Sequence, residues 1–235
     1  MTFRAVVIAA AILTPALTGS VLAQQPPAYS RPFISANQAV VSGLVLFATA
    51  FGDEGLREEL QEYRGSGSNS LARIGNAFGE PLYLFPAIGA GYLAGQLTGR
   101  SGLSRLSLKV GTAALVAGGI TTGLKFALGR TRPANGGDSD HFRPFSGSAS
   151  FPSGHTTLAF AVATVIADET TDSWSDMAVY GAASLTGLAR MNDDRHWASD
   201  VLAGALVGHL TARWLNRKSG LLSISPRSVG MSLAF

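Results

Sequence analysis

Three short runs, far apart in the chain, combine cationic, imidazole and carboxylate side chains at fixed spacing. They are Lys125 to Arg132-Pro133, then Pro152-Ser153-Gly154-His155, then Arg190, His196 and Asp200. A phosphoryl group keeps its negative charge on the non-bridging oxygens during transfer, so positioned cations can supply much of the catalysis. The runs therefore predict a phosphoryl-transfer site in which side chains, rather than a bound metal, provide the positive charge.

The cations of this predicted site are Lys125, Arg132 and Arg190. Arginine presents a planar fork that matches phosphate oxygens, whereas lysine acts as a compact point charge. A single lysine or arginine is usually a solvated surface residue. The prediction that these three bind phosphate therefore rests on the joint pattern.

The middle run favours the start of a helix. Pro152 suits a first helical turn, and residues 156–163 read as an apolar helix. Ser153, Gly154 and His155 would then lie at a helix N-terminus, where free N–H groups favour an anion. Ser153 adds a hydroxyl, Gly154 permits close approach of the backbone, and His155 could protonate a leaving alkoxide. Taken alone, the run would favour the alternative, a Ser- and Pro-rich loop leading into a helix.

In the third run, a polar turn follows Arg190 and a helix is expected to restart near His196. His196 and Asp200 are four residues apart, so on a helix they would share a face. A carboxylate on one ring nitrogen fixes the tautomer and makes the other nitrogen a better nucleophile. We therefore predict a phosphohistidine on His196. The alternative is a helix cap or a surface pair.

In order and spacing, the three runs resemble the phosphatidic acid phosphatase type 2 superfamily, which includes lipid phosphatases, bacterial nonspecific acid phosphatases and vanadate-dependent haloperoxidases. Two motifs are complete, and in the third Ala189 stands where the motif has serine. The resemblance covers about residues 80 to 215. It implies a helical bundle, His196 as nucleophile and His155 as acid/base. The implied phosphate ligands are Lys125, Arg132, Ser153, Gly154 and Arg190.

Composition excludes several other chemistries. The 235 residues include no cysteine, which rules out thiolate catalysis and cysteine-based metal sites. No zinc-protease, phosphate-loop or nucleophile-elbow motif is present, and we predict no metal and no cofactor. A net charge of +3 without a basic stripe predicts no nucleic-acid partner. His141 and His209 are interpreted as structural histidines.

The chain ends differ in composition from the middle. Residues 1–23 resemble a secretory signal peptide, with an uncleaved membrane anchor as the alternative. Residues 24–36 form a polar lead, and 37–218 are expected to be a helical phosphatase domain with its motif core at 80–215. The tail, 219–235, alternates polar and apolar residues and predicts a small β-hairpin.

The middle of the chain predicts an all-α, membrane-associated bundle of about six apolar helices. A charged helix at 53–64 is expected to end in a Gly-Ser-Gly-Ser turn at 65–68. Glycine pairs at four-residue spacing would allow close helix packing: Gly91/Gly95, Gly119/Gly123 and Gly204/Gly208. The apolar stretches are 32–52, 81–99, 110–124, 156–167, 177–189 and 201–212.

A helix needs about 20 apolar residues to cross a bilayer. Only 32–52 and 81–99 approach that length unaided, and 106–124 reaches it if Lys109 extends its amine to the interface. If 81–99 crosses first, Arg100 and Arg105 lie inside, as the positive-inside rule prefers, and the site faces outward. If 32–52 also spans, the site is cytoplasmic. We predict a bacterial inner-membrane protein with a periplasm-facing site, or a periplasmic protein.

The predicted activity is metal-independent hydrolysis of a phosphomonoester or diphosphate, above all of a lipid, through a phosphohistidine. A soluble periplasmic acid phosphatase is the main alternative. A vanadate-dependent haloperoxidase and a non-catalytic anion-binding membrane protein are further alternatives. The sequence carries no code for the particular lipid or for the oligomeric state.

Overall fold

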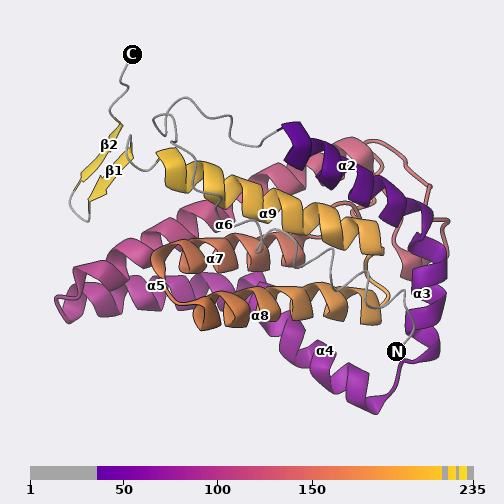
Figure 1. The fold of residues 1–235 in the computed structure, drawn as a ribbon, viewed down its shortest axis with the longest axis horizontal. Helices are drawn as coiled ribbons and strands as arrows, with labels where there is room; N and C mark the ends of the chain where they lie inside the picture. The colour runs from indigo at the N-terminus through magenta and orange to yellow at the C-terminus, as the bar shows by residue number, and fades with distance from the viewer. Residues whose placement is uncertain (1–35, 219–221, 226–227, 232–235) are drawn as a thin grey trace.

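The computed structural model describes residues 36–218, 222–225 and 228–231. The predicted signal peptide, residues 1–23, lies outside this range, as does most of the polar lead. The described part is helical apart from one hairpin, which confirms the all-α prediction (Figure 1). Its eight α-helices are the six apolar helices expected, the charged helix expected at 53–64, and one further helix at 66–79.

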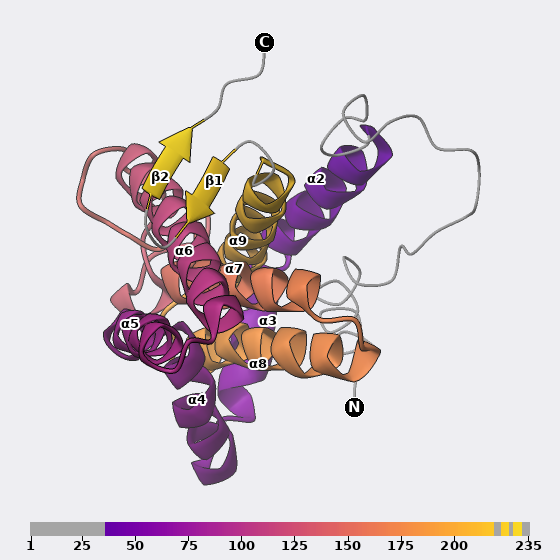
Figure 2. The ribbon, with the colours of Figure 1, turned by 90° about the vertical axis from the view of Figure 1, so that its left-hand side faces the viewer.

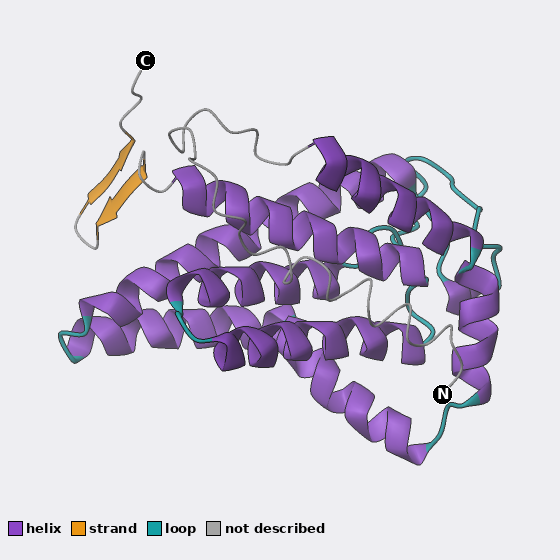
Figure 3. Cartoon of the chain, in the orientation of Figure 1, coloured by secondary structure: helices purple, strands orange, loops and turns teal. Residues whose placement is uncertain are grey.

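The elements follow one another along the chain with short connections, except for one long loop after α6 (Figure 3). They are α2 (Ala36–Phe51), α3 (Asp53–Glu62), α4 (Ser66–Gly79), α5 (Pro81–Leu97), α6 (Ser101–Leu128), η2 (Pro133–Asn135), α7 (Gly154–Glu169), α8 (Ser173–Asn192), α9 (Ala198–Lys218), β1 (Leu222–Ser225) and β2 (Ser228–Met231).

Helix α7 forms the centre of the bundle and packs against α6, α8 and α9. Its side chains Phe160, Ala161 and Val165 are buried on all sides by these neighbours. The threonines of this helix are also buried, and they meet their hydrogen-bonding needs locally. Thr157 and Thr164 each donate to the carbonyl four residues earlier. An almost fully buried helix can therefore carry polar residues at little cost.

Glycines set the close contact between α7 and α9. A Cβ at Gly204 would lie 2.5 Å from the carbonyl oxygen of Ser153, and one at Gly208 would lie 2.2 Å from that of Thr157. The α5–α6 contact is similar, since a Cβ at Gly95 would lie 2.4 Å from Ser104 Oγ. The role predicted for the pair Gly119 and Gly123 is wrong within the described structure, because a Cβ at either position would meet nothing within 4 Å.

Two predicted boundaries need correction. Residues 66–68 are not a turn; they begin α4, with Gly65 as the N-cap. The stretch 81–99 forms α5, which has 17 residues and ends before Gly99, whose φ is +69°. The long apolar helix is α6, with 28 residues, because it starts upstream of Arg105 and Lys109 and continues through them.

Among the described residues, α6 alone is long and apolar enough to cross a membrane by itself. Residues 39–51 of α2 and the whole of α3 meet at a bend of 61°. Together they are long and apolar enough to form a second span if both helices belong to one broken membrane crossing. Composition and length therefore support one or two spans, and the first candidate is α6 rather than 81–99.

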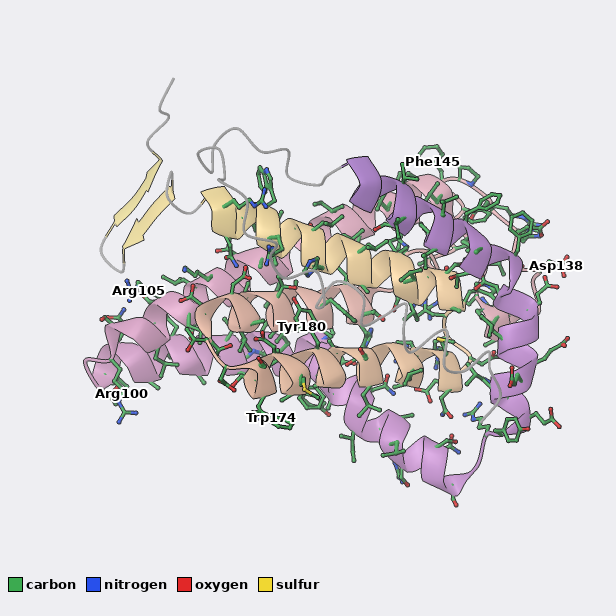
Figure 4. The ribbon with its side chains drawn as sticks, viewed as in Figure 1. Arg100, Arg105, Asp138, Phe145, Trp174 and Tyr180 are labelled. Atoms are coloured by element: carbon green, nitrogen blue, oxygen red, sulfur yellow. The ribbon has the colours of Figure 1, made fainter. Side chains whose placement is uncertain are left out.

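The bundle has two different ends. At one end α5 turns into α6, and Arg100 and Arg105 lie there (Figure 4). At the other end lies the loop between α6 and α7, marked by Asp138 and Phe145 (Figure 4). Figure 2 shows α5 and α6 on one side of the bundle and α2 beside α9 on another. The three motif runs all belong to the loop end.

The C-terminal strands form the predicted hairpin. β1 pairs with β2 in antiparallel register, with Leu222 opposite Met231 and Ser225 opposite Ser228.

Candidate active site

The loop between α6 and α7 is folded back onto the end of α6. Gly129, with φ +60°, ends the helix, and its carbonyl accepts a hydrogen bond from Arg143 N at 3.0 Å. A Cβ at Gly129 would lie 1.8 Å from the carbonyl oxygen of Arg143, so only glycine fits. This closure brings the first two motif runs together.

The second run lies at a helix N-terminus, as predicted, but its boundary is shifted. Ser153 is the N-cap of α7 and Gly154 is its first residue, so Pro152 precedes the helix instead of entering its first turn. Ser153 is buried, and its hydroxyl accepts a hydrogen bond from Thr156 Oγ1 at 2.9 Å. A Cβ at Gly154 would lie 3.7 Å from Lys125 Cε, which places the lysine stem against this N-terminus.

The three cations lie near one another. Lys125 donates to the carbonyl oxygens of Ala149 and Ser150 at 2.5 and 3.1 Å. The positive charges of Arg132 and Arg190 both act on this ammonium group, and the charge of Arg132 acts on Arg190. Within residues 36–218, none of the three forms a salt bridge. The cluster therefore has an excess of positive charge.

Arg190 is held by α4 and has a free donor. Its Nη1 donates to Asn76 Oδ1 at 2.8 Å, and Asn76 in turn donates to Asp193 at 2.7 Å. The Nε of Arg190 is buried and has no partner in the described part of the chain. Burial, followed by repulsion from Arg132, lowers the pKa of Arg190 below its ordinary value. For Arg132, burial and then repulsion from Arg195 lower the pKa as well.

His196 and Asp200 are paired, although not on one helix face. His196 lies in the loop two residues before α9, which begins at Ala198. Its Nδ1 lies 3.3 Å from Asp200 Oδ2, and both residues are buried. Because Nδ1 faces a carboxylate, it carries the ring proton, and Nε2 is left with its lone pair. The predicted pairing holds, while the predicted helical geometry is wrong.

Asp200 is fixed by more groups than the sequence suggested. Its carboxylate also accepts from Ser150 Oγ at 2.5 Å, from Trp197 N at 3.0 Å and from Arg130 at 2.6 Å. Burial alone would raise the pKa of Asp200. The hydrogen bond from His196 and the electrostatic effects of His196 and Arg130 together outweigh burial, and they hold the pKa of Asp200 below its ordinary value.

Arg130 is a buried cation with two carboxylate partners. Its guanidinium bonds Asp200 at one nitrogen and Asp53, the first residue of α3, at another, at 2.6 and 2.8 Å. It also lies 5.6 Å from the ring centroid of Trp197. A buried charge needs such complete pairing. α3 is thus linked through Arg130 to the carboxylate that orients His196.

Burial lowers the pKa of His196 to about 4, although its hydrogen bond to Asp200 and the charge of Asp200 act in the opposite direction. The positive charges of Lys125 and Arg190 lower it further. His196 is therefore neutral near pH 7, which is the state that a nitrogen nucleophile requires.

His155 has a different carboxylate partner. Its Nε2 lies 3.1 Å from Glu80 Oε2, at the junction of α4 and α5, and this pair is only partly buried. Burial, and then repulsion from Arg190, lower the pKa of His155, while the hydrogen bond and charge of Glu80 raise it. The two histidines thus have separate carboxylates from separate elements.

A pocket near this end of the bundle lies apart from the predicted catalytic residues. It has a volume of about 810 Å³ and lies between α2 and the α6–α7 loop, and its walls include Phe47, Phe142 and Phe151. Arg130, which is bonded to Asp200, also lines this pocket, but none of the predicted catalytic residues does.

His209 is hydrogen-bonded to Thr164 and Tyr180, so its structural interpretation stands. Among the described residues, no group of three or more acidic or histidine side chains is placed to hold a metal.

The sequence comparison identifies the family. The PAP2 superfamily pattern matches residues 106–221, which contain all three runs. Through these residues, the chain belongs to the PAP2 superfamily. The PAP2 match begins within α6 and covers α7, α8 and α9, so it includes each residue of the cation cluster and both histidines.

Two curated relatives are similar over part of their length. Lipid A 1-phosphatase of Porphyromonas gingivalis is 42% identical over 95 residues, covering 40% of this chain and 19% of that protein. Lipid phosphate phosphatase 1 of Arabidopsis thaliana is 32% identical over 137 residues, covering 45% of this chain and 42% of that protein. The chain therefore spans less than half the length of either relative.

Two solved structures share the fold. The transmembrane PAP2 type phosphatidylglycerolphosphate phosphatase of Bacillus subtilis has a TM-score of 0.57, with 20% identity, covering 77% of this chain and 95% of that chain. Aquifex aeolicus LpxE has a TM-score of 0.52, also with 20% identity, covering 71% of this chain and 94% of that chain. These likenesses show that the arrangement of helices is that of PAP2 proteins.

The PAP2 motifs identified the charged and imidazole side chains of the site. They did not identify the residues that hold these side chains in place. Glu80, Asn76 and Asp53 precede the matched region, so no motif signals them. Arg130 lies inside the first run, two residues before Arg132. Its charge was visible in the sequence, but its burial between two carboxylates was not.

Proposed function

We propose that this protein is a phosphatase that hydrolyses a phosphomonoester or diphosphate, with a phosphorylated lipid as its substrate. The cluster of Lys125, Arg132 and Arg190 is the observation that carries the proposal. Three cations that repel one another, one of them with a buried, unpartnered Nε, form a stable arrangement when a multiply charged anion lies between them. A phosphate group, with several acceptor oxygens, meets that requirement.

The two histidines divide the chemistry. Nε2 of His196 attacks phosphorus, and the bond from phosphorus to the leaving oxygen breaks as the nitrogen–phosphorus bond forms. Protonated His155 gives its proton to the leaving oxygen, so the lipid departs as a neutral alcohol or a protonated phosphate. Asp200 stabilises the positive charge that develops on the His196 ring.

The second half-reaction returns the site to its starting state. Neutral His155 removes a proton from a water molecule as the water oxygen attacks phosphorus. The nitrogen–phosphorus bond breaks, inorganic phosphate is released, and His155 is protonated again. Ser153, the N–H of Gly154 at the start of α7, and the three cations hold the non-bridging oxygens in both steps.

Lipid is favoured as the substrate by the surface of the helices that surround the site. α6 is apolar enough to span a membrane and is about 42 Å long at 1.5 Å per residue. Both curated relatives are named as lipid phosphatases, one for lipid A and one for lipid phosphates. Large apolar side chains are exposed on neighbouring helices, including Val40, Leu44, Phe47, Leu82, Leu93, Leu97, Leu115, Ile120 and Phe126.

The two ends of the bundle favour one orientation. Arg100 and Arg105 lie at the end opposite the motif loop (Figure 4). In a bacterial inner membrane, the positive-inside rule would place this arginine end in the cytoplasm. The site would then face the periplasm, which agrees with a secretory signal at residues 1–23.

The test is phosphate release by the purified protein in detergent, from a panel of phosphorylated lipids, with a chelator present. The wild-type protein should release phosphate from at least one lipid, and His196→Ala should lower kcat/KM by about 10⁴-fold or more. His141→Ala removes an imidazole outside the cluster and is the control. Turnover of His196→Ala close to that of wild type would remove His196 as the nucleophile. Release of the protein from membranes by carbonate would favour the soluble phosphatase instead.

A further inference from the structure

Glu80 lies beside the cation cluster but belongs to none of the three motif runs. It is the N-cap of α5, and its Oε1 accepts from Leu82 N at 3.4 Å. Its other oxygen, Oε2, accepts from His155 Nε2 at 3.1 Å. One carboxylate therefore joins the start of a helix to the proposed acid of the site.

The backbone around Glu80 is held against His155. A Cβ at Gly79 would lie 2.4 Å from the carbonyl oxygen of His155 and 2.8 Å from Thr186 Cγ2. The end of α4 can approach α7 and α8 this closely because Gly79 has no side chain. The position of Glu80 thus follows from a tight contact between elements, and its carboxylate does not reach His155 by chance from a free loop.

The charges around His155 explain what this carboxylate can do. Arg190 from α8 and Lys125 from α6 both oppose a proton on His155, and burial acts in the same direction. Glu80 is the carboxylate that favours the proton. His196 and Asp200, from the loop before α9 and its first turn, are already paired with each other. A general acid among several cations needs such a partner to remain protonated.

We propose that Glu80 is a positioning residue that holds the imidazole of His155 in the site and keeps it protonated for the leaving oxygen. This inference rests on the proposed phosphatase function, because it assigns a role within the same reaction. It adds to the catalytic arrangement a residue that lies outside the region matched by the family.

The experiment compares Glu80→Gln with the wild-type protein on two substrates. Glutamine keeps an oxygen for the α5 cap and removes the charge. The first substrate is a phosphorylated lipid whose alcohol leaving group needs a proton, and the second is p-nitrophenyl phosphate, whose phenolate leaves without one. kcat/KM is measured for both across pH, because it reports steps up to the first cleavage. Asp172→Asn, at the N-cap of α8, is the matched control for a cap that does not contact His155.

Glu80→Gln should lower kcat/KM for the lipid about tenfold more than for p-nitrophenyl phosphate, a part of the 10²–10⁴ that acid catalysis contributes. The basic limb of its lipid profile should move to lower pH, because His155 then loses its proton more easily. Asp172→Asn should change neither quantity.

An equal decrease on both substrates, with an unmoved basic limb, would overturn the proposal and leave Glu80 as a helix cap alone. Failure of the proposed function would look different. In that case the wild-type protein would not release phosphate from either substrate, or His196→Ala would keep full turnover.

Discussion

The two sides of the candidate site hold their histidines in opposite ways. On the nucleophile side, His196 and Asp200 are sealed from solvent and tied to Arg130 and Asp53. On the acid side, the side chains of His155 and Glu80 are 23% and 36% exposed, and one hydrogen bond joins them. Both pairs consist of a histidine and a carboxylate, so the difference lies in their surroundings.

This difference matches two chemical needs. A nucleophilic imidazole must be neutral, and deep burial disfavours its charged form. An acid imidazole must be protonated, and a less buried carboxylate can favour the proton without being neutralised itself. A similar pairing thus supports two roles because the degree of burial differs. Four predictions test this comparison, beginning with the largest expected effect.

Asp200→Asn should remove the orientation of the nucleophile. The amide can hold His196 in the wrong tautomer, and it cannot stabilise the charge on the ring. We expect kcat/KM to fall by about 10³-fold or more, as for the corresponding change in serine protease triads. Phosphate release is the measurement, and Asp168→Asn, a surface carboxylate bonded to Arg213 and Asn216, is the control. A loss smaller than tenfold would show that burial alone orients His196.

Arg130→Met should destabilise the nucleophile side. The change leaves Asp53 and Asp200 buried without their cation, which costs about 3–5 kcal/mol of unfolding free energy. Thermal unfolding in detergent measures the effect. Arg57→Met is the matched control, because its pair with Asp194 is partly exposed and should contribute about 0–1 kcal/mol. Equal shifts for both variants would contradict the view that Asp200 depends on Arg130.

Gly208→Ala should separate α7 from α9. Its Cβ would meet the carbonyl of Thr157 at 2.2 Å, a backbone atom that cannot move away alone. We expect a loss of about 1–3 kcal/mol from overpacking. Gly119→Ala, on the open face of α6, should instead be neutral or stabilise by up to about 1 kcal/mol. If both variants unfold at the same temperature, close packing at α9 is not needed to hold the nucleophile side.

The pH dependence distinguishes the two histidines. His196 has a pKa of about 4 and must be neutral to attack, so kcat/KM should fall as the pH decreases through about 4. His155 must be protonated, so kcat/KM should also fall as the pH rises above its lowered pKa, below 6.5. Glu80→Gln should move only the basic limb. An acidic limb between pH 6 and 7 would mean that His196 is solvated rather than buried.

The chemical groups of the candidate site could be predicted from the sequence alone. Lys125, Arg132, His155, Arg190, His196 and Asp200 were predicted from spacing, because the ends of helices and short loops fix the local position of each run. The all-α class and the hairpin followed from periodicity. These features depend on residues that are near one another in the chain.

How those groups are held depends on contacts between segments that are far apart in the chain. Asp53 lies 77 residues from Arg130, and Glu80 lies 75 residues from His155, so no local pattern links them. The same limit explains the errors at Pro152, at His196 and at Gly119 and Gly123. A helix boundary or a glycine contact is settled by the element that packs against it. Charge could be read from the chain, whereas burial, which sets the state of each histidine, arises when distant helices meet.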